Sequence, residues 1–151
     1  MITKGGLFML YGVVFSILSG ILVSLQGIFN TRASEHIGLW HTNTLVHGSG
    51  FILALIILMA VSKISFANIK DVNPFYLLGG VLGVLIVFSV MKGISALGAS
   101  YAITILIVTQ IITNALINYF GIFGEHVITF SWTQILGLLM MIGGIFLYQL
   151  T

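Results

Sequence analysis

Amide and imidazole side chains recur at four-residue spacing inside long apolar runs of this sequence. They are Gln26 and Asn30, then Asn43 and His47, then Gln110, Asn114 and Asn118. Residues four apart share one face of a helix, so each set predicts a polar stripe. Buried polar groups in lipid need partners, and these uncharged ones suit hydrogen bonding to a solute along a lined pathway. The alternative is hydrogen bonding between helices, worth about 0.6–2 kcal/mol per bond.

His47 and Lys92 are the two side chains within these runs that could carry a charge. His47 lies about five residues inside its run and can titrate near neutrality, which makes it a candidate coupling group. Its alternative role is that of an ordinary satisfied hydrogen-bonding group. Lys92 is the deepest cation, and its long stem can carry the ammonium to the nearer membrane surface. Otherwise it is a counter-charge for an anionic substrate or for Glu35.

The remaining composition excludes several kinds of chemistry. The chain has no cysteine, hence no disulfide, thiolate nucleophile or cysteine-based metal site. No His, Asp and Glu residues stand at metal-ligand spacing, and no acid–base pair suggests catalysis. A net charge of +2 is too small to indicate a nucleic-acid partner. We therefore expect no enzyme activity, no cofactor and no metal site.

Five apolar runs must position the polar groups. Hydrophobic residues make up 59% of the chain and charged residues 5%, against about 25% charged in a soluble domain. The runs cover residues 7–30, 42–62, 75–97, 101–121 and 131–150. Each reaches the roughly 20 residues that a spanning helix needs, and a spanning backbone must satisfy its own hydrogen bonds. The sequence therefore predicts an all-α membrane protein, with a bundle of five transmembrane helices in a single membrane domain, residues 1–151.

Short connections are expected between the runs. Residues 31–41 form the first predicted loop. The second, residues 63–74, ends in an Asn73-Pro74 step that is typical of a helix start. Residues 98–100 predict a tight break, and residues 122–130, with Glu125 and His126, predict a last loop.

The basic residues give a weak indication of orientation. With five spans, Lys4, Lys63 and Lys70 fall on one side of the membrane, and Arg32 and Lys92 fall on the other. An excess of Lys and Arg marks the cytoplasmic side. Two alternatives stay open: a chain fixed with its N-terminus inside, and a dual topology in which the chain inserts both ways.

Glycines at helical spacing indicate where helices approach closely. Gly79, Gly80 and Gly83 form one small-residue patch. Gly137 and Gly144 are two turns apart and share a face of the last helix. This second pair predicts either a dimer contact or packing within one protomer.

Three stretches together resemble one known family. The first covers residues 20–30, with Gln26-Gly-Ile-Phe-Asn30, and continues to Gly38. The second begins with residues 79–83, continues through Gly98 and Gln110, and ends with residues 115–121, which include Asn118-Tyr-Phe-Gly121. The third covers residues 137–144. The chain is similar to the YdcZ-like family of the drug/metabolite transporter (DMT) superfamily, which is related to the small multidrug resistance transporters. The resemblance covers nearly the whole chain.

The resemblance implies a half-sized DMT-type transporter in the bacterial plasma (inner) membrane. Such a multi-pass protein would pair with a second copy as a homodimer, antiparallel in one arrangement, or with a homologous half. It would be a secondary transporter that exports or imports a small organic solute or drug-like compound by alternating access. Coupling of this transport to protons is one alternative. The alternative function is a non-transporting membrane subunit, or assembly partner, whose polar stripes only pack helices.

Two departures from the family pattern bear on the site. Asn118 stands where the family often has Asp, and Ala96-Leu97 stands where a Pro often precedes the glycine matching Gly98. The first departure removes one possible proton or cation site. The uncharged lining then favours a neutral or modestly polar solute. The expected substrate contacts are Gln26, Asn30, Asn43, His47, Gln110 and Asn114, and the expected coupling or counter-charge groups are His47 and Lys92.

Overall fold

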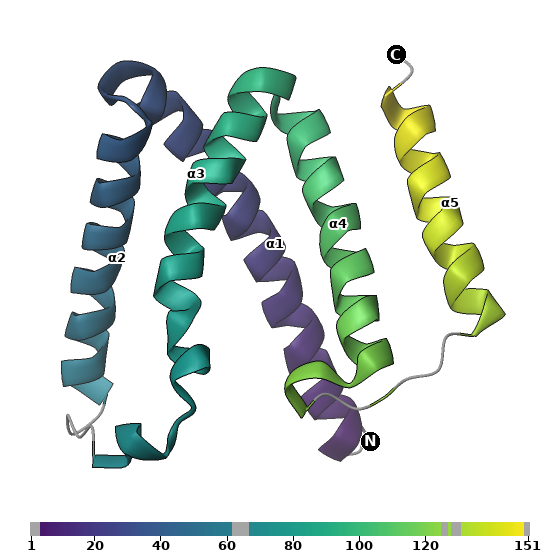
Figure 1. Ribbon diagram of the computed structural model, residues 1–151, viewed down its shortest axis with the longest axis horizontal. Helices are drawn as coiled ribbons and strands as arrows, with labels where there is room; N and C mark the ends of the chain where they lie inside the picture. Colours follow the sequence, from purple (N-terminus) through teal and green to yellow (C-terminus); the bar gives the residue numbers. More distant parts are fainter. Residues whose placement is uncertain (1–3, 62–66, 125–126, 128–130, 150–151) are drawn as a thin grey trace. The chain divides into compact units, whose positions relative to one another are not determined.

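The computed structural model describes residues 4–61, 67–124, 127 and 131–149, and they form an all-helical structure (Figure 1). The α-helices are α1 (Lys4–Ile37), α2 (Leu39–Val61), α3 (Gly79–Leu97), α4 (Ala99–Phe120) and α5 (Trp132–Gln149). Short 3-10 segments cover Ala67–Asp71, Pro74–Leu78 and Ile122–Gly124. Within the described part of the chain there is no strand. The prediction of an all-α protein is therefore confirmed.

Four of the helical segments are long and apolar enough to cross a membrane. They are Met9–Ile37, Leu39–Val61, Pro74–Leu97 and Ala99–Phe120, with mean hydropathy between 1.7 and 2.2. The apolar part of α5 within the described residues, Trp132–Ile145, is shorter than these. The structure thus fits a multi-pass membrane bundle, whereas the fifth span stays a prediction.

The predicted loop over residues 31–41 is wrong, because α1 continues to Ile37 and α2 begins at Leu39. Polar residues suggested a loop, but they lie on a helix that extends past its apolar part. Arg32 and Glu35, one turn apart, form an exposed ion pair at 3.2 Å on its surface. The two helices are separated by Gly38 alone, whose φ of 88° favours glycine.

The other predicted boundaries shift by smaller amounts. The tight break at residues 98–100 is reduced to Gly98 (φ 81°), and α4 begins directly after it. The helix start at Asn73-Pro74 is confirmed, since Asn73 Oδ1 accepts a 3.1 Å hydrogen bond from the Phe75 amide. Its first residues are a 3-10 segment, however, and the α-helix begins at Gly79. Lys63, Glu125, His126 and the last residues of the second and fifth predicted runs lie outside the described residues.

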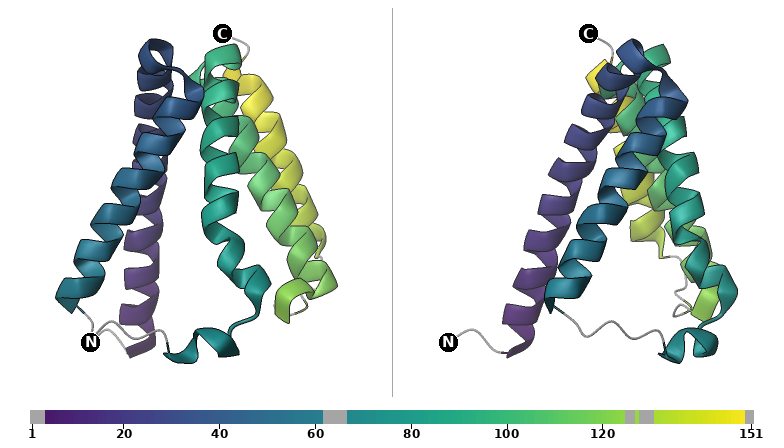
Figure 2. Two further views of the ribbon diagram at one scale, coloured as in Figure 1. Left: turned by 60° about the vertical axis from the view of Figure 1, so that its left-hand side comes forward. Right: turned by 90° about the vertical axis from the view of Figure 1, so that its left-hand side faces the viewer.

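The chain divides by its internal contacts into two compact units, Met1–Ala96 and Leu97–Thr151. The predicted single membrane domain stays a prediction. In the first unit, α1 and α2 meet at their Gly38 ends and run back from there, as both views in Figure 2 show. The second unit contains α4 and α5, which lie side by side in Figures 1 and 2.

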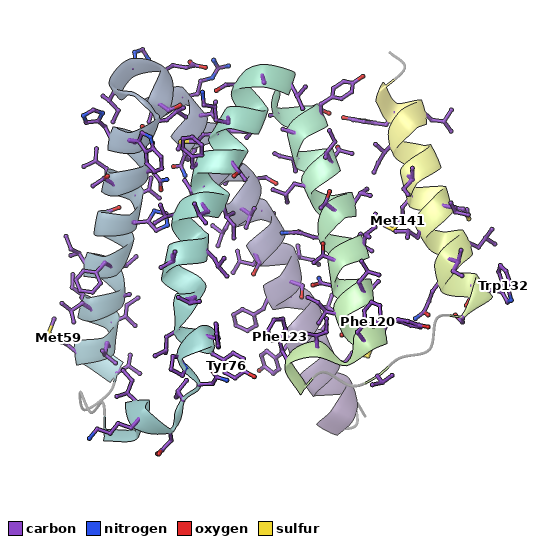
Figure 3. All side chains as sticks on the ribbon, viewed as in Figure 1. Met59, Tyr76, Phe120, Phe123, Trp132 and Met141 are labelled. Carbon is purple, nitrogen blue, oxygen red and sulfur yellow. The ribbon has the colours of Figure 1, made fainter. Side chains whose placement is uncertain are left out.

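The distribution of side chains in the first unit is the reverse of that in a soluble protein. Only Met91 and Ile94 are buried apolar side chains within the described residues, and aliphatic and aromatic groups cover the outsides of the helices (Figure 3). The buried polar side chains are Asn30, Thr31, Thr42 and Asn43. An apolar exterior around polar interior groups suits a chain surrounded by lipid, where an outward-facing polar group would lack partners.

Close approach between helices of the described chain occurs at one of the five glycines named above, and a contact with a second copy stays a prediction for Gly137 and Gly144. A Cβ atom at Gly83 would lie 3.2 Å from His47 Nε2, so α3 approaches α2 closely there. A Cβ atom at Gly79, Gly80, Gly137 or Gly144 would meet no atom of the described chain within 4 Å. A close approach that the sequence did not suggest occurs at Gly27, where a Cβ would lie 3.2 Å from both Val90 and Ile94 side chains.

Candidate functional site

Polar residues gather inside the first unit near the junction of α1 and α2. Asn30, Thr31, Thr42 and Asn43 are each less than a tenth exposed. Thr31 Oγ1 donates to the Gly27 carbonyl at 2.7 Å, and Thr42 Oγ1 donates to the Gly38 carbonyl at 3.0 Å. Each hydroxyl thus donates to the backbone carbonyl four residues before it, which leaves the two asparagines as the groups available for other contacts.

Asn43 joins α2 to α3 and still has an unused acceptor. Its Nδ2 donates to the Val84 carbonyl at 2.8 Å. Its Oδ1 is buried and has no hydrogen-bond partner among the described residues. The Nδ2 atom therefore links two helices by a hydrogen bond, while Oδ1 remains available to accept a hydrogen bond from another group.

His47 lies one turn after Asn43 and is half-buried. Its Nδ1 lies 3.0 Å from the Asn43 carbonyl oxygen. Because a carbonyl only accepts, Nδ1 carries a hydrogen in this contact, and Nε2 of the neutral ring is an acceptor. Nε2 faces Gly83 of α3. The predicted Asn43–His47 pair is thus brought together, and α3 packs against both residues.

The other residues expected to act in this unit are placed differently. Gln26 is exposed on α1, whereas Asn30, four residues on, is buried. The Lys92 side chain is exposed on α3. Glu35 forms an ion pair with Arg32 of its own helix. Arg32, and not Lys92, is therefore the counter-charge of Glu35. The structure therefore unites Asn43 and His47 and leaves Gln26 and Lys92 on the outside.

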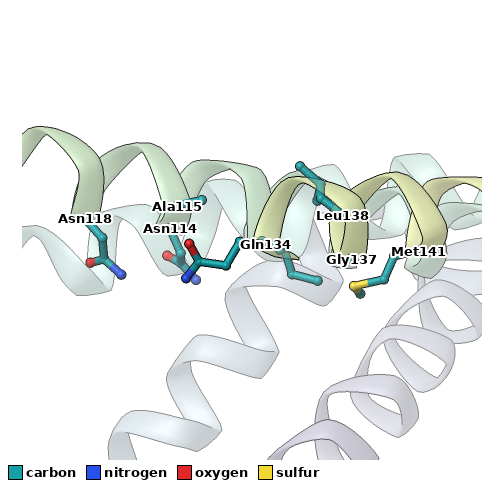
Figure 4. A pocket seen from close by; sticks show the side chains of 8 residues that line it. Asn114, Ala115, Asn118, Gln134, Gly137, Leu138 and Met141 are labelled. Carbon is teal, nitrogen blue, oxygen red and sulfur yellow. The ribbon is translucent and has the colours of Figure 1, made fainter. Parts of the chain in front are cut away.

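A pocket of about 430 Å³ lies in the second unit between α4 and α5 (Figure 4). Its lining residues are Ile111, Asn114, Ala115, Asn118, Gln134, Gly137, Leu138 and Met141. In Figure 4 the side chains of Asn114, Asn118 and Gln134 extend to the same side of the two helices, and Met141 lies farther along α5. The walls combine three carboxamides with apolar groups, and none of the lining residues is charged.

The pocket includes part of the predicted polar stripe of α4 and adds a residue that sequence reasoning missed. Asn114 and Asn118 line it, whereas Gln110 is exposed and is not among its lining residues. The added residue is Gln134 from α5. The signal that could have found it is Ser131-Trp-Thr-Gln134, which has the spacing of a helix-capping motif and so fixes where α5 begins.

The capping motif is formed at the start of α5. The Gln134 backbone N–H donates to Ser131 Oγ at 3.3 Å, and the side-chain oxygen Oε1 of Gln134 accepts from the Ser131 backbone N–H at 3.0 Å. These reciprocal bonds satisfy amide groups that a helix start otherwise leaves without partners. The Gln134 side chain is thereby held by its oxygen at the end of the pocket nearest the start of α5.

Further apolar hollows accompany the pocket. One of about 310 Å³ is lined by Thr104, Ile107, Met141, Gly144, Ile145 and Tyr148, so it shares Met141 with the pocket. Gly144 lines this hollow and Gly137 lines the pocket, and the Cβ position of each is open to 4 Å. Among the described residues, no three His, Asp or Glu side chains form a group that could hold a metal ion. The lining of the pocket offers hydrogen-bond donors and acceptors to an uncharged molecule.

Comparison with known families gives a match over most of the chain. A family model described as "Putative inner membrane exporter, YdcZ" matches residues 11–147 of the chain. A search of curated proteins and a search of solved structures found no match.

Proposed function

The chain belongs to the YdcZ family of inner membrane exporters, and from that premise we propose that it is a dimeric secondary transporter that exports a small, uncharged organic solute by alternating access. It is a multi-pass inner membrane protein and, as a member of an exporter family, a transporter rather than an enzyme. Its placement in the drug/metabolite transporter superfamily, beside the small multidrug resistance proteins, belongs to this proposal.

The observation that carries the proposal is the carboxamide-lined pocket between α4 and α5. A site of about 430 Å³ can hold a drug-sized molecule, and most ligand pockets are apolar with a few polar groups that set orientation. Asn114, Asn118 and Gln134 supply both donors and acceptors without a charge. An uncharged lining suits a neutral solute, because a buried charge without a partner is costly.

A second copy of the chain is the expected partner. Five helices are half of the set that a full-length transporter of this superfamily would contain. The open surface at Gly144 on α5, which is not among the lining residues of the pocket, would let a partner helix approach closely in lipid. Transporters built from two related halves place substrate between them near the membrane midplane.

The proposal is tested by solute flux into liposomes that contain the purified protein. A panel of radiolabelled neutral, zwitterionic and cationic drug-like solutes is offered to wild type, Asn114→Ala and Gln110→Ala. We expect saturable flux of a neutral solute, reduced at least about fivefold by Asn114→Ala, because the lost contact is worth about 1 kcal/mol or more. Gln110→Ala is the matched control on the same helix, outside the pocket, and should retain flux.

Two outcomes would contradict the proposal. The first is the absence of saturable flux above empty liposomes for every solute in the panel. The second is equal flux in wild type and Asn114→Ala at unchanged thermal stability. The sequence also predicted Gln110 as a substrate contact. If that is correct, Gln110→Ala will lower flux, and the same pair of variants tests it.

His47 is proposed as the group that couples transport to protons. Its Nδ1 is held by the Asn43 carbonyl, and its Nε2, the acceptor of the neutral ring, faces Gly83. His47→Gln keeps a hydrogen-bonding side chain but removes the imidazole. Flux in the variant should continue down the solute gradient and should no longer be accelerated by an imposed pH gradient. Identical acceleration in wild type and His47→Gln would exclude this role.

A second candidate function, a non-transporting subunit held together by polar contacts, is favoured by one observation. Asn43 uses its amide to join α2 to α3, which is the behaviour of interhelical glue. If all the stripes have this role, Asn114→Ala should lower stability as Asn43→Ala does. Under the transporter proposal, only Asn43→Ala lowers the thermal midpoint, and Asn114→Ala lowers flux.

A further inference from the structure

The capping motif of α5 determines which end of the Gln134 carboxamide is available to a ligand. The Ser131 amide can only donate, so the atom it meets at 3.0 Å must be the oxygen of Gln134. The NH₂ group of Gln134 is then the end left over, and no hydrogen bond uses it within the described part of the chain. Gln134 therefore presents a fixed pair of donors at the pocket rather than an adaptable amide.

The pocket has a polar end and an apolar end. Asn118 lies close to the end of α4 at Phe120, and Gln134 lies close to the start of α5 at Trp132. Ile111 and Met141 line the pocket farther along both helices. The helix ends are nearest the membrane surface, so the amide end faces the interface and the apolar end faces the bilayer interior.

We propose that this pocket binds an uncharged amphiphile whose hydrogen-bond acceptor, such as an amide or ketone carbonyl, meets the Gln134 NH₂ group while its apolar body lies against Met141. The assignment rests on the proposed function and adds two points to it. These are the substrate class and the orientation of the solute along the pocket, with its acceptor at Gln134 and its apolar body at Met141. A flat aromatic body suits the apolar end, because the thioether of Met141 makes favourable contacts with aromatic rings. Gly137 leaves the space for it, since no atom lies within 4 Å of its Cβ position.

Charge separates this class from its competitors. An ammonium ion offers only donors, and it would meet the donor end of Gln134 with no carboxylate among the lining residues. A carboxylate could accept from Gln134 but would find no basic partner in the lining. A neutral carbonyl compound satisfies the donor and brings no charge into an apolar pocket.

Gln134→Glu tests the donor while keeping the fold of the helix start. Glutamate fills the same position in the capping motif as glutamine, so its carboxylate still accepts from the Ser131 amide. The side chain keeps its length, but the NH₂ donors are replaced by a second acceptor oxygen. Gln134→Ala removes both the donor and the side-chain half of the cap, so the difference between its thermal midpoint and that of Gln134→Glu measures what this half of the cap contributes to stability.

Binding is read from methyl signals of methionine by NMR on the protein in lipid nanodiscs. The chain has six methionines, and Met141→Leu identifies the Met141 signal. Met59 on α2 is exposed in the other unit and reports solute that merely dissolves in the lipid. The probes are acetanilide, a neutral aryl amide with a carbonyl acceptor, and phenethylammonium, an aryl cation that only donates.

We expect acetanilide to shift the Met141 signal saturably, to leave Met59 unchanged, and to bind about three- to tenfold more weakly to Gln134→Glu, which is the effect of losing one hydrogen bond. Phenethylammonium should bind more weakly than acetanilide to wild type and gain affinity in Gln134→Glu. The proposal is overturned by equal acetanilide affinity in wild type and Gln134→Glu, by stronger binding of phenethylammonium to wild type, or by no saturable Met141 shift.

These results separate the pocket from the transport activity. A protein that binds acetanilide at Met141 but carries no solute across liposomes would keep the assignment of the pocket and refute the transporter. A protein with saturable flux and no response at Met141 would keep the transporter and refute this pocket as its site.

Discussion

Gly83 is the residue through which α3 makes its closest approach to the polar stripe of α2. A Cβ atom there would lie 3.2 Å from His47 Nε2, and the imidazole cannot move away easily because its Nδ1 is bonded to the Asn43 carbonyl. Asn43 also donates to Val84, the neighbour of Gly83. The two contacts make this short part of α3 a fixed point in the first unit.

Gly83→Ala should therefore destabilise the protein, and Gly80→Ala should not. Overpacking of a tight contact costs about 1–3 kcal/mol, whereas alanine in an open helix position gains about 0.5–1 kcal/mol over glycine. Gly80 is the matched control because nothing lies within 4 Å of its Cβ position. Thermal unfolding in detergent, followed by circular dichroism, measures both. A Gly83→Ala protein at least as stable as Gly80→Ala would show that His47 is not confined.

At the scale of elements, glycine links of a single residue replace the loops that the sequence suggested. Gly38 connects α1 to α2 with φ 88°, and the Thr42 amide donates to its carbonyl at 3.1 Å, so α2 is hydrogen-bonded from its first turn. Gly98 plays the same part before α4, where the Ala102 amide donates to its carbonyl at 3.1 Å. Neither link leaves room for an intervening loop.

Gly38→Ala should destabilise the α1–α2 pair by about 1–2 kcal/mol, which is the cost of holding an L-residue in a left-handed conformation. Gly48→Ala in the interior of α2 is the control, because its Cβ position is open and its backbone is helical. Both variants add one methyl group to the same hairpin. The difference in their thermal midpoints measures the strain, and equal midpoints would mean that the link relaxes without cost.

The elements also show how far the sequence could be interpreted. The apolar runs predicted the helices, because lipid leaves a spanning backbone no other way to satisfy its hydrogen bonds. The loop over residues 31–41 was wrong because charged residues on an exposed helix surface look the same in sequence as charged residues in a loop. Four-residue spacing predicted that Asn114 and Asn118 share a helix face, and both line the pocket. The capping motif marks Gln134 and the start of α5 in the sequence, but it says nothing about which neighbouring helix the residue faces.

The burial of a side chain can differ between residues whose positions in the sequence pattern are equivalent. Gln26 and Asn30 have the same spacing as Asn43 and His47, yet Gln26 is exposed and Asn30 is buried. Because residues four apart share a face, the difference comes from where along α1 the neighbouring helices pack, and an almost uniformly apolar helix gives little indication of that position. Partners of the buried groups, such as the Val84 carbonyl for Asn43, are backbone atoms and carry no sequence signal.

At the scale of the whole molecule, the orientation of the chain in the membrane remains a prediction. The basic residues divide weakly between the two sides, so we expect both orientations to occur. His36→Cys is a suitable reporter, because the chain has no native cysteine and His36 is exposed next to Gly38. An impermeant thiol reagent should label about half of the protein from each side of the membrane. Labelling from one side only would establish a fixed orientation and a parallel dimer or a separate partner.

Assembly of two copies is the other expectation at this scale. Gly144→Leu should abolish the dimer while the chain stays helical, because Leu would hold the partner helix away from α5 and close packing drives association in lipid. Gly143→Leu is the control one position away, since its Cβ position is equally open but faces another direction on the helix. Crosslinking in native membranes compares the two. A dimer that survives Gly144→Leu would place the contact on another helix.

The length of α1 has a consequence for how the protein enters the bilayer during synthesis. Its 34 residues extend about 51 Å at 1.5 Å per residue, against a hydrocarbon thickness of about 30 Å. The excess at one end carries the Arg32–Glu35 ion pair, and α2 starts back one residue after that end. With no slack between them, the two helices must integrate as one hairpin. We infer that insertion of residues 4–61 fixes the side of the membrane on which Gly38 lies, and that the orientation of every later helix follows from it.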